Sequence, residues 1–402
     1  MDILITVGIF PPDVGGPASF VPKIAKKLKE SGHNIKIICL SDKKNSNYKD
    51  ELNVTRISRS FPILFRWIIT IIKIFKHSKK SDLIFINGLG TEATIANLLS
   101  RKKVIRKIVG DPVWERAYNK KLTTKEFDEF QKDEQKRNIR IQQLIRNWSI
   151  NKSDLIITPS EHLKDFVLNI GYNKKILVIN NGVDIVNIER NILQQNSINL
   201  IVVSRLVTQK NINKIIEAMS LIQKDNVILK IIGEGNELAN LKNLVDEYKL
   251  DGKVNFLGRI KNEKIPDYLL ESDIFIQASS YEGLPHSLLE AMNYEIAVIS
   301  TNVGGCEELL NTSWEEAERG YFIPIITMEQ TTAGIENSRE QLWVSVDPED
   351  ISSRIERIVN NREEAKEKAR KAKEYIARRH NFAINSKIYE EEIYKLINEN
   401  NE

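Results

Sequence analysis

The sequence predicts an α/β fold built from two doubly wound domains, and three observations lead to this prediction. Short runs rich in β-branched residues alternate with helical patterns over residues 1–182. The same alternation restarts at residue 200, after the polar and aperiodic segment 184–199. A chain of 402 residues is also long enough for two domains, each with its own core. Because strand–helix alternation favours a parallel sheet with helices on both faces, we expect one such sheet on each side of the linker.

The individual elements follow from the positions of these runs. In the first half we expect a basic amphipathic helix over 19–31 and strands at 3–8, 34–40, 83–88, 103–110, 155–160 and 176–182. In the second half we expect strands at 200–205, 227–233, 254–258, 273–279 and 297–301. After Asp350 the chain is helical and charged, and 384–397 forms a separate amphipathic stretch. The predicted domains therefore cover 1–190 and 191–380, with a cleft between them and a C-terminal helix in 381–402.

Composition excludes several classes of protein. Hydrophobic residues make up 41% of the chain and charged residues 28%, which is typical of a globular protein. The net charge of +4 is too small to indicate nucleic-acid binding, and aromatic residues are not interleaved with the basic ones. Cys39 and Cys306 form no metal-ligand spacing, and the N-terminus enters a strand without a charged leader. We therefore expect a cytoplasmic protein.

Loops that follow strands are the places to look for a site, because doubly wound sheets bind ligands beyond the carboxyl ends of their strands. Gly15 and Gly16 precede the first helix, where glycine lets the backbone approach a phosphate, although an ordinary tight turn explains them equally well. Arg205 and Lys210 follow the strand 200–205. A guanidinium and an ammonium group suit a diphosphate, and the alternative is a pair of solvated charges.

Gly233 and Gly235 form an incomplete dinucleotide-binding pattern. The third glycine and the expected acidic residue are missing, so the sequence argues against NAD binding.

The segment YEGLPHSLLEAM, residues 281–292, places Glu282 and Glu290 around a Gly-Leu-Pro kink where a strand gives way to a helix. The free N–H groups of a helix N-terminus attract an anion, whereas a carboxylate that touched the same anion would repel it. Both glutamates must therefore face other parts of the ligand, and sugar hydroxyls are the natural hydrogen-bond donors. A phosphate with hydroxylated rings on both sides describes a nucleotide sugar.

Taken together and in their order along the chain, the motifs closely resemble those of the family-four retaining glycosyltransferases of GT-B fold, also called glycosyl transferases group 1. The matching segments are FPPDVGGPASFV, NNGVD, SRLVTQKN, VNFLGRI, EGLPHSLLEAM and VGGCEEL. The resemblance implies two Rossmann-like domains that face each other across a cleft, with the C-terminal helix returning to the first domain. It also implies transfer of a hexose, with retention, from a UDP- or GDP-linked sugar to a glycan or lipid-linked saccharide in polysaccharide or glycoconjugate biosynthesis.

The same resemblance implies roles for single residues. Glu282 would orient the transferred sugar and Glu290 would bind the ribose, while neither would be a nucleophile. Asp111 stands near the place where many relatives have a histidine and is the second catalytic candidate. The implied donor-binding set is Gly15, Gly16, Arg205, Lys210, Gly233, Arg259, Ile260, Gly283, Leu284, Pro285, His286 and Glu290. No metal or other cofactor is expected, since the chain has no Asp-x-Asp motif.

Alternatives remain at this stage. A nucleotide-sugar epimerase or a phosphorylase could use a similar fold, and a non-catalytic sugar-nucleotide-binding protein associated with a membrane is a third possibility. The apolar segment 61–80 is too short to span a bilayer. It is either a helix packed on the first sheet or an interfacial helix on anionic lipid, helped by Lys79, Lys80 and the basic helix at 23–29. The segment 326–341 is an apparent insertion to which the sequence assigns no role.

Overall fold

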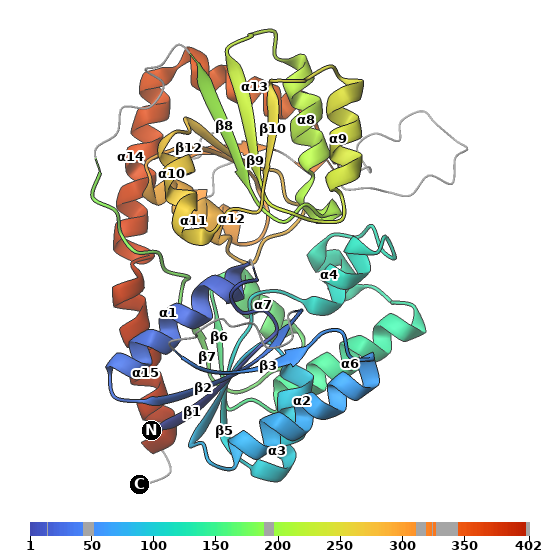
Figure 1. Cartoon of the computed structure of the whole chain (residues 1–402), viewed down its shortest axis with the longest axis vertical. Coiled ribbons are helices and arrows are strands. Elements are labelled where there is room, and N and C mark those ends of the chain that lie inside the picture. The colour runs from blue at the N-terminus through green and yellow to red at the C-terminus, as the bar shows by residue number, and fades with distance from the viewer. Residues whose placement is uncertain are drawn as a thin grey trace. The chain divides into compact units, whose positions relative to one another are not determined.

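The computed structural model describes residues 1–13, 15–42, 52–188, 197–310, 319–323, 325–326 and 345–398 of the chain. They fall into two compact units, each with a helix-covered sheet (Figure 1). Unit 1 comprises Met1–Val109, Lys136–Asn180 and Ala383–Glu402, and unit 2 comprises Gly110–Gln135 and Asn181–Phe382. The prediction of an α/β fold with two doubly wound sheets is confirmed.

The sheet of unit 1 has seven parallel strands in the order β3-β2-β1-β4-β5-β6-β7. The strands are β1 (Asp2–Val7), β2 (Asn34–Ser41), β3 (Asn53–Ser58), β4 (Leu83–Asn87), β5 (Lys103–Lys107), β6 (Leu155–Thr158) and β7 (Ile176–Val178). The central strands are continuous apolar runs because both of their faces are buried. Strand β3 was not predicted, since only its last two residues, Ile57 and Ser58, are buried and its polar residues mask the strand pattern.

Helices cover both faces of this sheet. They are α1 (Gly16–Glu30), α2 (Ile63–Ser78), α3 (Gly90–Ser100), α6 (Arg137–Asn151), α7 (Glu161–Asn169) and α15 (Phe382–Asn398). Ile74 of α2 and Ala93 of α3 form a core with Leu4 and Ile84 on one face. On the opposite face Tyr389 of α15 packs against Phe20 of α1, with ring centroids 5.4 Å apart.

The C-terminal helix α15 thus returns to unit 1, as the resemblance implied. Its Glu392 carboxylate also binds the Lys175 ammonium at 2.6 Å. The basic residues at 23–29 belong to α1 and lie on the opposite face of the sheet from α2. The expectation that they assist the segment 61–80 is therefore wrong, because the crossover from β3 to β4 puts α2 on the other side.

The sheet of unit 2 has six parallel strands in the order β10-β9-β8-β11-β12-β13. The strands are β8 (Ile198–Val203), β9 (Val227–Ile232), β10 (Val254–Gly258), β11 (Ile274–Gln277), β12 (Ala297–Thr301) and β13 (Tyr321–Ile323). Strands β14 (Ile325–Ile326) and β15 (Ser345–Val346) form a separate antiparallel pair. The chain runs outward in both directions from β8 and β11, so the switch point of the sheet lies between these two strands.

The helices of unit 2 pack on both faces of its sheet. They are α8 (Ile212–Leu221), α9 (Leu238–Glu247), α10 (Ile265–Leu270), α11 (His286–Asn293), α12 (Gly305–Leu310), α13 (Pro348–Asn360) and α14 (Arg362–Arg379), with the short turns η1 (Thr208–Lys210) and η2 (Asn262–Lys264). Ile216 and Ile355 join one core cluster, and Leu288 and Ile376 join the other. Alternate residues of the strands point to the two clusters, as Leu200 and Ile201 do in β8.

Two short helices of the first half, α4 (Pro112–Asn119) and α5 (Phe127–Lys132), belong to unit 2. The Phe127 ring stacks on the Tyr281 ring, with centroids 4.0 Å apart and planes 5° apart. The Trp114 ring meets the Tyr281 ring edge-on, with centroids 5.2 Å apart. The Tyr118 and Ser280 hydroxyls lie 2.9 Å apart. Where the sequence placed 110–135 in a domain of residues 1–190, these aromatic contacts place it in unit 2.

Parts of two other predictions lie outside the described residues. The linker 184–199 is described only at 184–188 and 197–199, and its last two residues belong to β8. The units divide after Asn180, whereas the sequence placed the domain boundary after residue 190. Of the apparent insertion 326–341, only the first residue is described.

Candidate functional site

Two motif loops meet at the switch point of unit 2. The loop after β8 carries Arg205 and Lys210, and the loop after β11 carries Glu282. The Gln209 side-chain amide donates to the Tyr281 carbonyl at 3.0 Å, and the Ser280 N–H donates to the Gln209 carbonyl at 2.9 Å. The two loops are therefore fastened together by their own hydrogen bonds, which brings together motifs that lie about 70 residues apart in the chain.

An ion pair between Lys210 and Glu282 lies at the centre of this site. Lys210 Nζ contacts Glu282 Oε1, and the Ser279 hydroxyl donates to the same oxygen at 2.7 Å. The two side chains are only 14% and 12% exposed. The sequence assigned the lysine to a diphosphate and the glutamate to a sugar, and the structure shows that the two groups are direct neighbours. Neutralisation of the glutamate by the lysine removes the electrostatic conflict between a carboxylate and a nearby anion site.

Arg205 adds positive charge beside this pair. It follows β8 and is exposed, so its guanidinium is open to solvent. An exposed guanidinium next to a neutralised Lys–Glu pair leaves the loop with excess positive charge. Such an arrangement suits an anionic ligand.

Helix α11 begins next to the ion pair. Pro285 precedes its first turn without a side-chain cap. The first amides of a helix have no acceptor within the helix, so this end can donate to an anion. His286 and Glu290 lie on α11 and are half-buried. Gly283, Leu284 and Pro285 precede the helix and are buried, and their contact with a ligand stays a prediction.

The motifs VGGCEEL and NNGVD fix the shape of this loop. The Gly305 N–H donates to the Glu282 carbonyl at 2.9 Å, and the Asn181 side chain donates to the Leu284 carbonyl at 3.0 Å. A Cβ on Gly304 would lie 2.2 Å from the Glu282 carbonyl oxygen. A Cβ on Gly305 would lie equally close to the Gly283 carbonyl oxygen. Both glycines are therefore required for close backbone packing.

Gly233 has a similar packing function. Its φ is +147°, and a Cβ would lie 1.8 Å from the Ser204 carbonyl oxygen, so the loop after β9 can press against the loop after β8. Arg259 and Ile260 follow Gly258 at the end of β10, where Arg259 is exposed and Ile260 half-buried. All three residues lie at the carboxyl edge of the sheet. Their contact with a donor stays a prediction.

Asp111 has a different setting from the one the sequence suggested. It is fully buried and caps α4, where Oδ1 accepts the Val113 N–H at 3.0 Å and Oδ2 accepts the Gln131 amide at 2.9 Å. Both of its oxygens are thus engaged in holding α4 and α5. Its contact with a transferred sugar stays a prediction. Gly15 and Gly16 belong to unit 1, where Gly15 precedes α1 with φ of +145°.

Sequence reasoning missed Glu115. This half-buried carboxylate lies in the first turn of α4. Burial raises its pKa, the charges of Arg205 and Lys210 lower it, and those of Asp111 and Glu282 raise it. These interactions place Glu115 electrostatically among the charged residues of the site. No sequence pattern distinguishes it from an ordinary glutamate near a helix N-terminus, because its position depends on the aromatic packing of α4.

We expect Glu115→Gln to stabilise the protein near neutral pH. The folded-state pKa of Glu115 is raised above the unfolded value of about 4.3, so its contribution to stability is full below that pH and is lost as the pH rises through the folded-state pKa. Thermal melts from pH 4 to 8 measure this effect. The variant should melt above wild type at neutral pH, and the difference should disappear in acid. The exposed glutamate Glu247 provides the control Glu247→Gln, and an equal gain from both variants would contradict the assignment.

Within the described residues, no group of three or more His, Cys, Asp or Glu side chains is placed to hold a metal ion. Cys306, behind the site, is fully buried and its thiol lies 3.2 Å from the Gln277 amide. Burial raises the pKa of this thiol, which keeps it protonated and unsuited to nucleophilic attack. The described helices also include none that is long and apolar enough to cross a bilayer.

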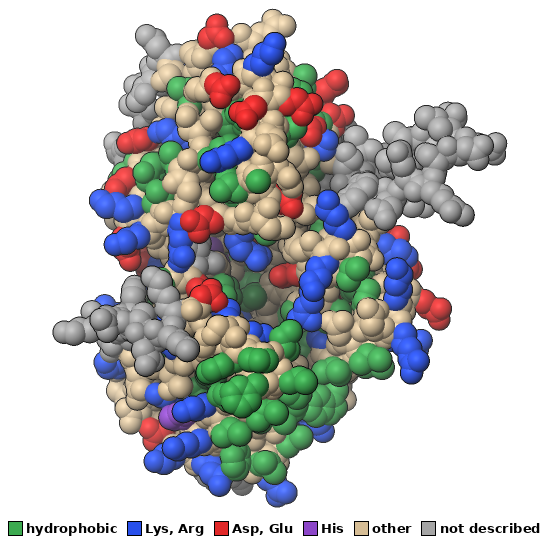
Figure 2. All heavy atoms as spheres, turned by 45° about the vertical axis from the view of Figure 1, so that its right-hand side comes forward, with side chains coloured by type: hydrophobic (Ala, Val, Ile, Leu, Met, Phe, Trp, Pro, Cys, Tyr) green, Lys and Arg blue, Asp and Glu red, His purple; other side chains and the backbone are tan. Residues whose placement is uncertain are grey.

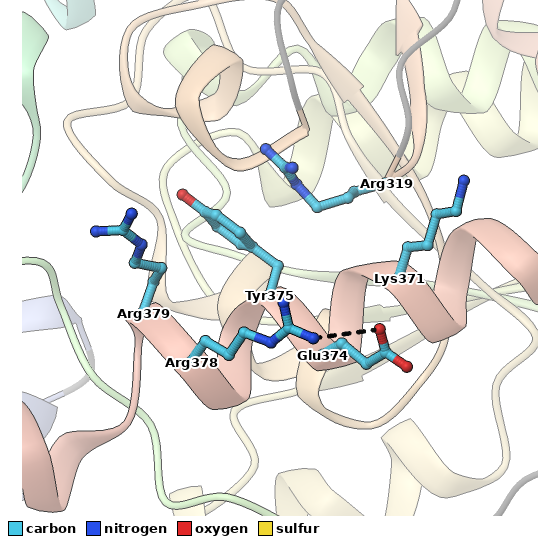
Figure 3. Close-up of a pocket in the computed structure, with 6 residues that line it drawn as sticks. All are labelled: Arg319, Lys371, Glu374, Tyr375, Arg378 and Arg379. Atoms are coloured by element: carbon cyan, nitrogen blue, oxygen red, sulfur yellow. Dashed lines mark ion pairs between the residues drawn. The ribbon is translucent and has the colours of Figure 1, made fainter.

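A separate hollow of unit 2 lies along α14 (Figure 3). Its volume is about 380 Å³, and its lining residues are Arg319, Lys371, Glu374, Tyr375, Arg378 and Arg379. The Arg319 guanidinium lies 4.0 Å from the Tyr375 ring centroid and donates to the Leu309 carbonyl at 2.6 Å. Arg319 therefore caps the end of α12 and joins it to α14, which gives it a structural function.

Two family models match consecutive parts of the chain. The model described as Glycosyltransferase Family 4 matches residues 14–186, and the model described as Glycosyl transferases group 1 matches residues 186–341. The two matches meet inside the predicted linker 184–199.

Three related proteins align with this chain over part of its length. An uncharacterized glycosyltransferase of Methanocaldococcus jannaschii is 26% identical over 260 residues, which are 61% of this chain and 60% of the relative. The amylovoran biosynthesis glycosyltransferase AmsD of Erwinia amylovora is 34% identical over 79 residues, 20% of this chain and 22% of the relative. A subunit of the Saccharomyces cerevisiae phosphatidylinositol N-acetylglucosaminyltransferase is 29% identical over 86 residues, 21% of this chain and 19% of the relative. The chain thus matches less than two thirds of each relative.

Solved structures match over nearly the whole length. Anabaena HepE in complex with UDP and glucose has a TM-score of 0.74 at 18% identity, covering 98% of this chain and 100% of that one. Sucrose-phosphate synthase from Thermosynechococcus elongatus has a TM-score of 0.75 at 16% identity, covering 98% of both chains. At these identities the likeness concerns the fold.

Proposed function

The chain belongs to the group 1 glycosyltransferases and has the GT-B fold, and from this premise we propose that it transfers a hexose from a UDP- or GDP-linked donor to a glycan or lipid-linked saccharide. Transfer proceeds with retention and without a metal ion. The observation that carries this proposal is the Lys210–Glu282 pair beside the start of α11, at the switch point of unit 2. The complexes of Anabaena HepE with UDP and with UDP-glucose support a uridine donor by analogy of fold.

The arrangement of charges suggests how the donor lies. Its diphosphate binds Arg205, Lys210 and the first amides of α11. The ribose diol donates to Glu290 on the same helix, one turn further along. The transferred sugar lies on the side of Glu282. This order places each carboxylate against hydroxyl groups and each cation against phosphate oxygens.

The proposed transfer reaction follows from these positions of the diphosphate, the ribose and the transferred sugar. The bond between the anomeric carbon and the diphosphate oxygen breaks, and the acceptor oxygen bonds to the same face of the sugar. The departing diphosphate takes the acceptor proton, so no glutamate acts as nucleophile. Arg205, Lys210 and the α11 amides stabilise the negative charge that grows on the leaving group, and Glu282 stabilises the positive charge that grows on the sugar.

A thermal-shift screen with UDP, GDP and their common sugars tests the donor proposal. A ligand that binds only the folded chain stabilises it by about 2.7 kcal/mol at one hundred times its Kd. We expect one nucleotide series to raise the Tm by several degrees without added metal, and EDTA to leave that shift unchanged. AMP and NAD are the negative controls. No shift with either series would refute the donor proposal, and loss of the shift in EDTA would refute metal independence.

Product analysis separates the alternatives. A transferase releases the free nucleoside diphosphate as the acceptor gains a sugar, whereas an epimerase returns an altered nucleotide sugar. A binding protein releases neither product. Incubation of the stabilising donor with candidate acceptors, followed by NMR of the anomeric proton, also shows whether the configuration is retained.

A further inference from the structure

Unit 1 exposes a large apolar face on α2. Six bulky side chains of this helix are between 37% and 78% exposed, namely Ile63, Leu64, Phe65, Trp67, Ile68 and Ile72. Thr70, Ile74 and Ser78 of the helix are buried, and the half-buried Ile69, Ile71 and Phe75 pack against the same core. The helix therefore packs on the core by one side and leaves its six most exposed apolar side chains in water.

The neighbouring helices extend this face. Helix α3 packs against both α2 and α6, and the Thr94 and Ser149 hydroxyls join α3 to α6 at 2.8 Å. The exposed residues of these two helices are Leu98, Leu99, Ile141, Leu144, Ile145 and Trp148. Figure 2 shows hydrophobic side chains gathered in one continuous area of this part of unit 1. We call these residues of the three helices the apolar face. Soluble proteins rarely expose a connected patch of this extent without a partner.

The charges around the apolar face are mostly positive. Helices α2 and α6 contain no Asp or Glu, and Glu92 is the only acidic residue of α3. Exposed basic residues lie in the second half of α2, directly after it and in the first turn of α6, namely Lys73, Lys76, Lys79, Lys80, Arg137 and Arg140. Burial lowers the pKa of His77 at the end of α2, and the nearby charges of Lys36, Lys73, Lys76 and Lys80 lower it further.

We propose that the apolar face docks unit 1 on the surface of an anionic lipid bilayer. The exposed aliphatic side chains enter the boundary between headgroups and acyl chains, and Trp67 and Trp148 supply rings that suit this boundary. The basic residues meet the negative headgroups. Helix α2, with 16 residues, is about 24 Å long and shorter than the hydrocarbon core, so it lies on the bilayer.

A second copy of the chain fits this face less well. A symmetric dimer brings the same patch of each subunit together. The lysines and arginines of both copies would then meet with Glu92 of α3 as the one acidic residue per copy on these helices, which costs electrostatic energy. An anionic bilayer satisfies the apolar and the basic residues together.

Flotation of the full-length protein with phosphatidylcholine vesicles, with and without phosphatidylglycerol, tests the proposal. We expect binding to vesicles that contain phosphatidylglycerol, and weaker binding at high salt. The variants are Leu64→Gln/Ile68→Gln on α2 and Leu144→Gln/Trp148→Gln on α6, each expected to weaken binding about tenfold or more. Leu221→Gln/Leu270→Gln in unit 2 removes two side chains that are each 44% exposed, and binding should not change.

Several outcomes would overturn the proposal. Failure of wild type to bind either vesicle would refute it, and so would a loss of binding in the control variant as large as in the others. A lipid-free dimer in analytical ultracentrifugation, dissociated by the α2 and α6 substitutions, would assign the face to a second copy. Full loss with the α2 variant and none with the α6 variant would limit docking to one helix and refute the three-helix face. The nucleotide-induced Tm shift should persist in every variant, so the proposed function and the docking surface can fail separately.

Discussion

The variant Lys210→Gln is expected to lower both nucleotide affinity and turnover. In the free protein Lys210 neutralises Glu282, and in the proposed complex it turns to the diphosphate. Removal of a preorganised group that stabilises developing charge lowers kcat by about 10²- to 10³-fold. Loss of an ammonium–phosphate contact also weakens binding of the product nucleotide. The measurements are kcat for release of nucleoside diphosphate and the nucleotide-induced Tm shift.

The same variant is expected to lose stability. It leaves the Glu282 carboxylate, only 12% exposed, without its cation, which costs about 2 kcal/mol for a pair that is not completely buried. The double variant Lys210→Gln/Glu282→Gln should regain most of that stability, because no unpaired charge remains. Its turnover should stay low. Comparison of the single and the double variant therefore separates the effect of Lys210 on stability from its effect on turnover.

A second ion pair of unit 2 provides the matched control. Lys373 binds Glu295 at 2.9 Å, with side chains 19% and 20% exposed, and neither residue lies in the motif loops. Lys373→Gln should destabilise the chain by a similar amount and leave kcat unchanged once the protein is folded. Equal losses of turnover in Lys210→Gln and Lys373→Gln would show that the effect of Lys210 is structural.

The sequence was sufficient to predict that the two motif loops of this site lie at the same edge of the sheet, but not that Lys210 and Glu282 form an ion pair. Arg205, Lys210 and Glu282 all follow strands of a doubly wound sheet, and the carboxyl ends of parallel strands meet at one edge. That rule places the two loops together once the strands are recognised. The strands β8 and β11 are short apolar runs buried on both faces, so their pattern is clear.

The position of α4 and α5 could not be predicted in the same way. Their assignment to unit 2 rests on the contact of Phe127 and Trp114 with Tyr281, residues more than 150 positions apart. Such side-chain packing leaves no periodic signal. For this reason the capping of α4 by Asp111 was not foreseen, and Glu115 was overlooked.

The apolar face illustrates a second limit. The hydrophobic period of 61–80 predicted a helix with two possible environments, and the structure shows that the helix packs on the core by one side and leaves six apolar side chains exposed. The contribution of α3 and α6 was not predicted. It depends on which helices the order of strands places on the same side of the sheet.

Glu282→Gln is expected to separate turnover from nucleotide binding. The amide keeps the size of the side chain and can still accept from the Ser279 hydroxyl, but it removes the negative charge. If Glu282 stabilises positive charge on the transferred sugar, kcat should fall about 10²- to 10³-fold. The lysine that Glu282 held is then free to meet the diphosphate. UDP or GDP should therefore bind at least as tightly as to wild type, which is the opposite of the result for Lys210→Gln.

Nucleotide binding is thus expected to change in opposite directions in Glu282→Gln and Lys210→Gln. Comparison of the two variants therefore shows which part of the donor lies against Glu282. A lower nucleotide-induced Tm shift in Glu282→Gln would mean that the carboxylate contacts the nucleotide or shapes its pocket. Unchanged turnover would remove Glu282 from the reaction. Glu295→Gln is the control, since it also breaks an ion pair of similar exposure and should change neither measurement. A fall in kcat with preserved nucleotide binding in Glu282→Gln alone would place the transferred sugar, and not the diphosphate, against Glu282.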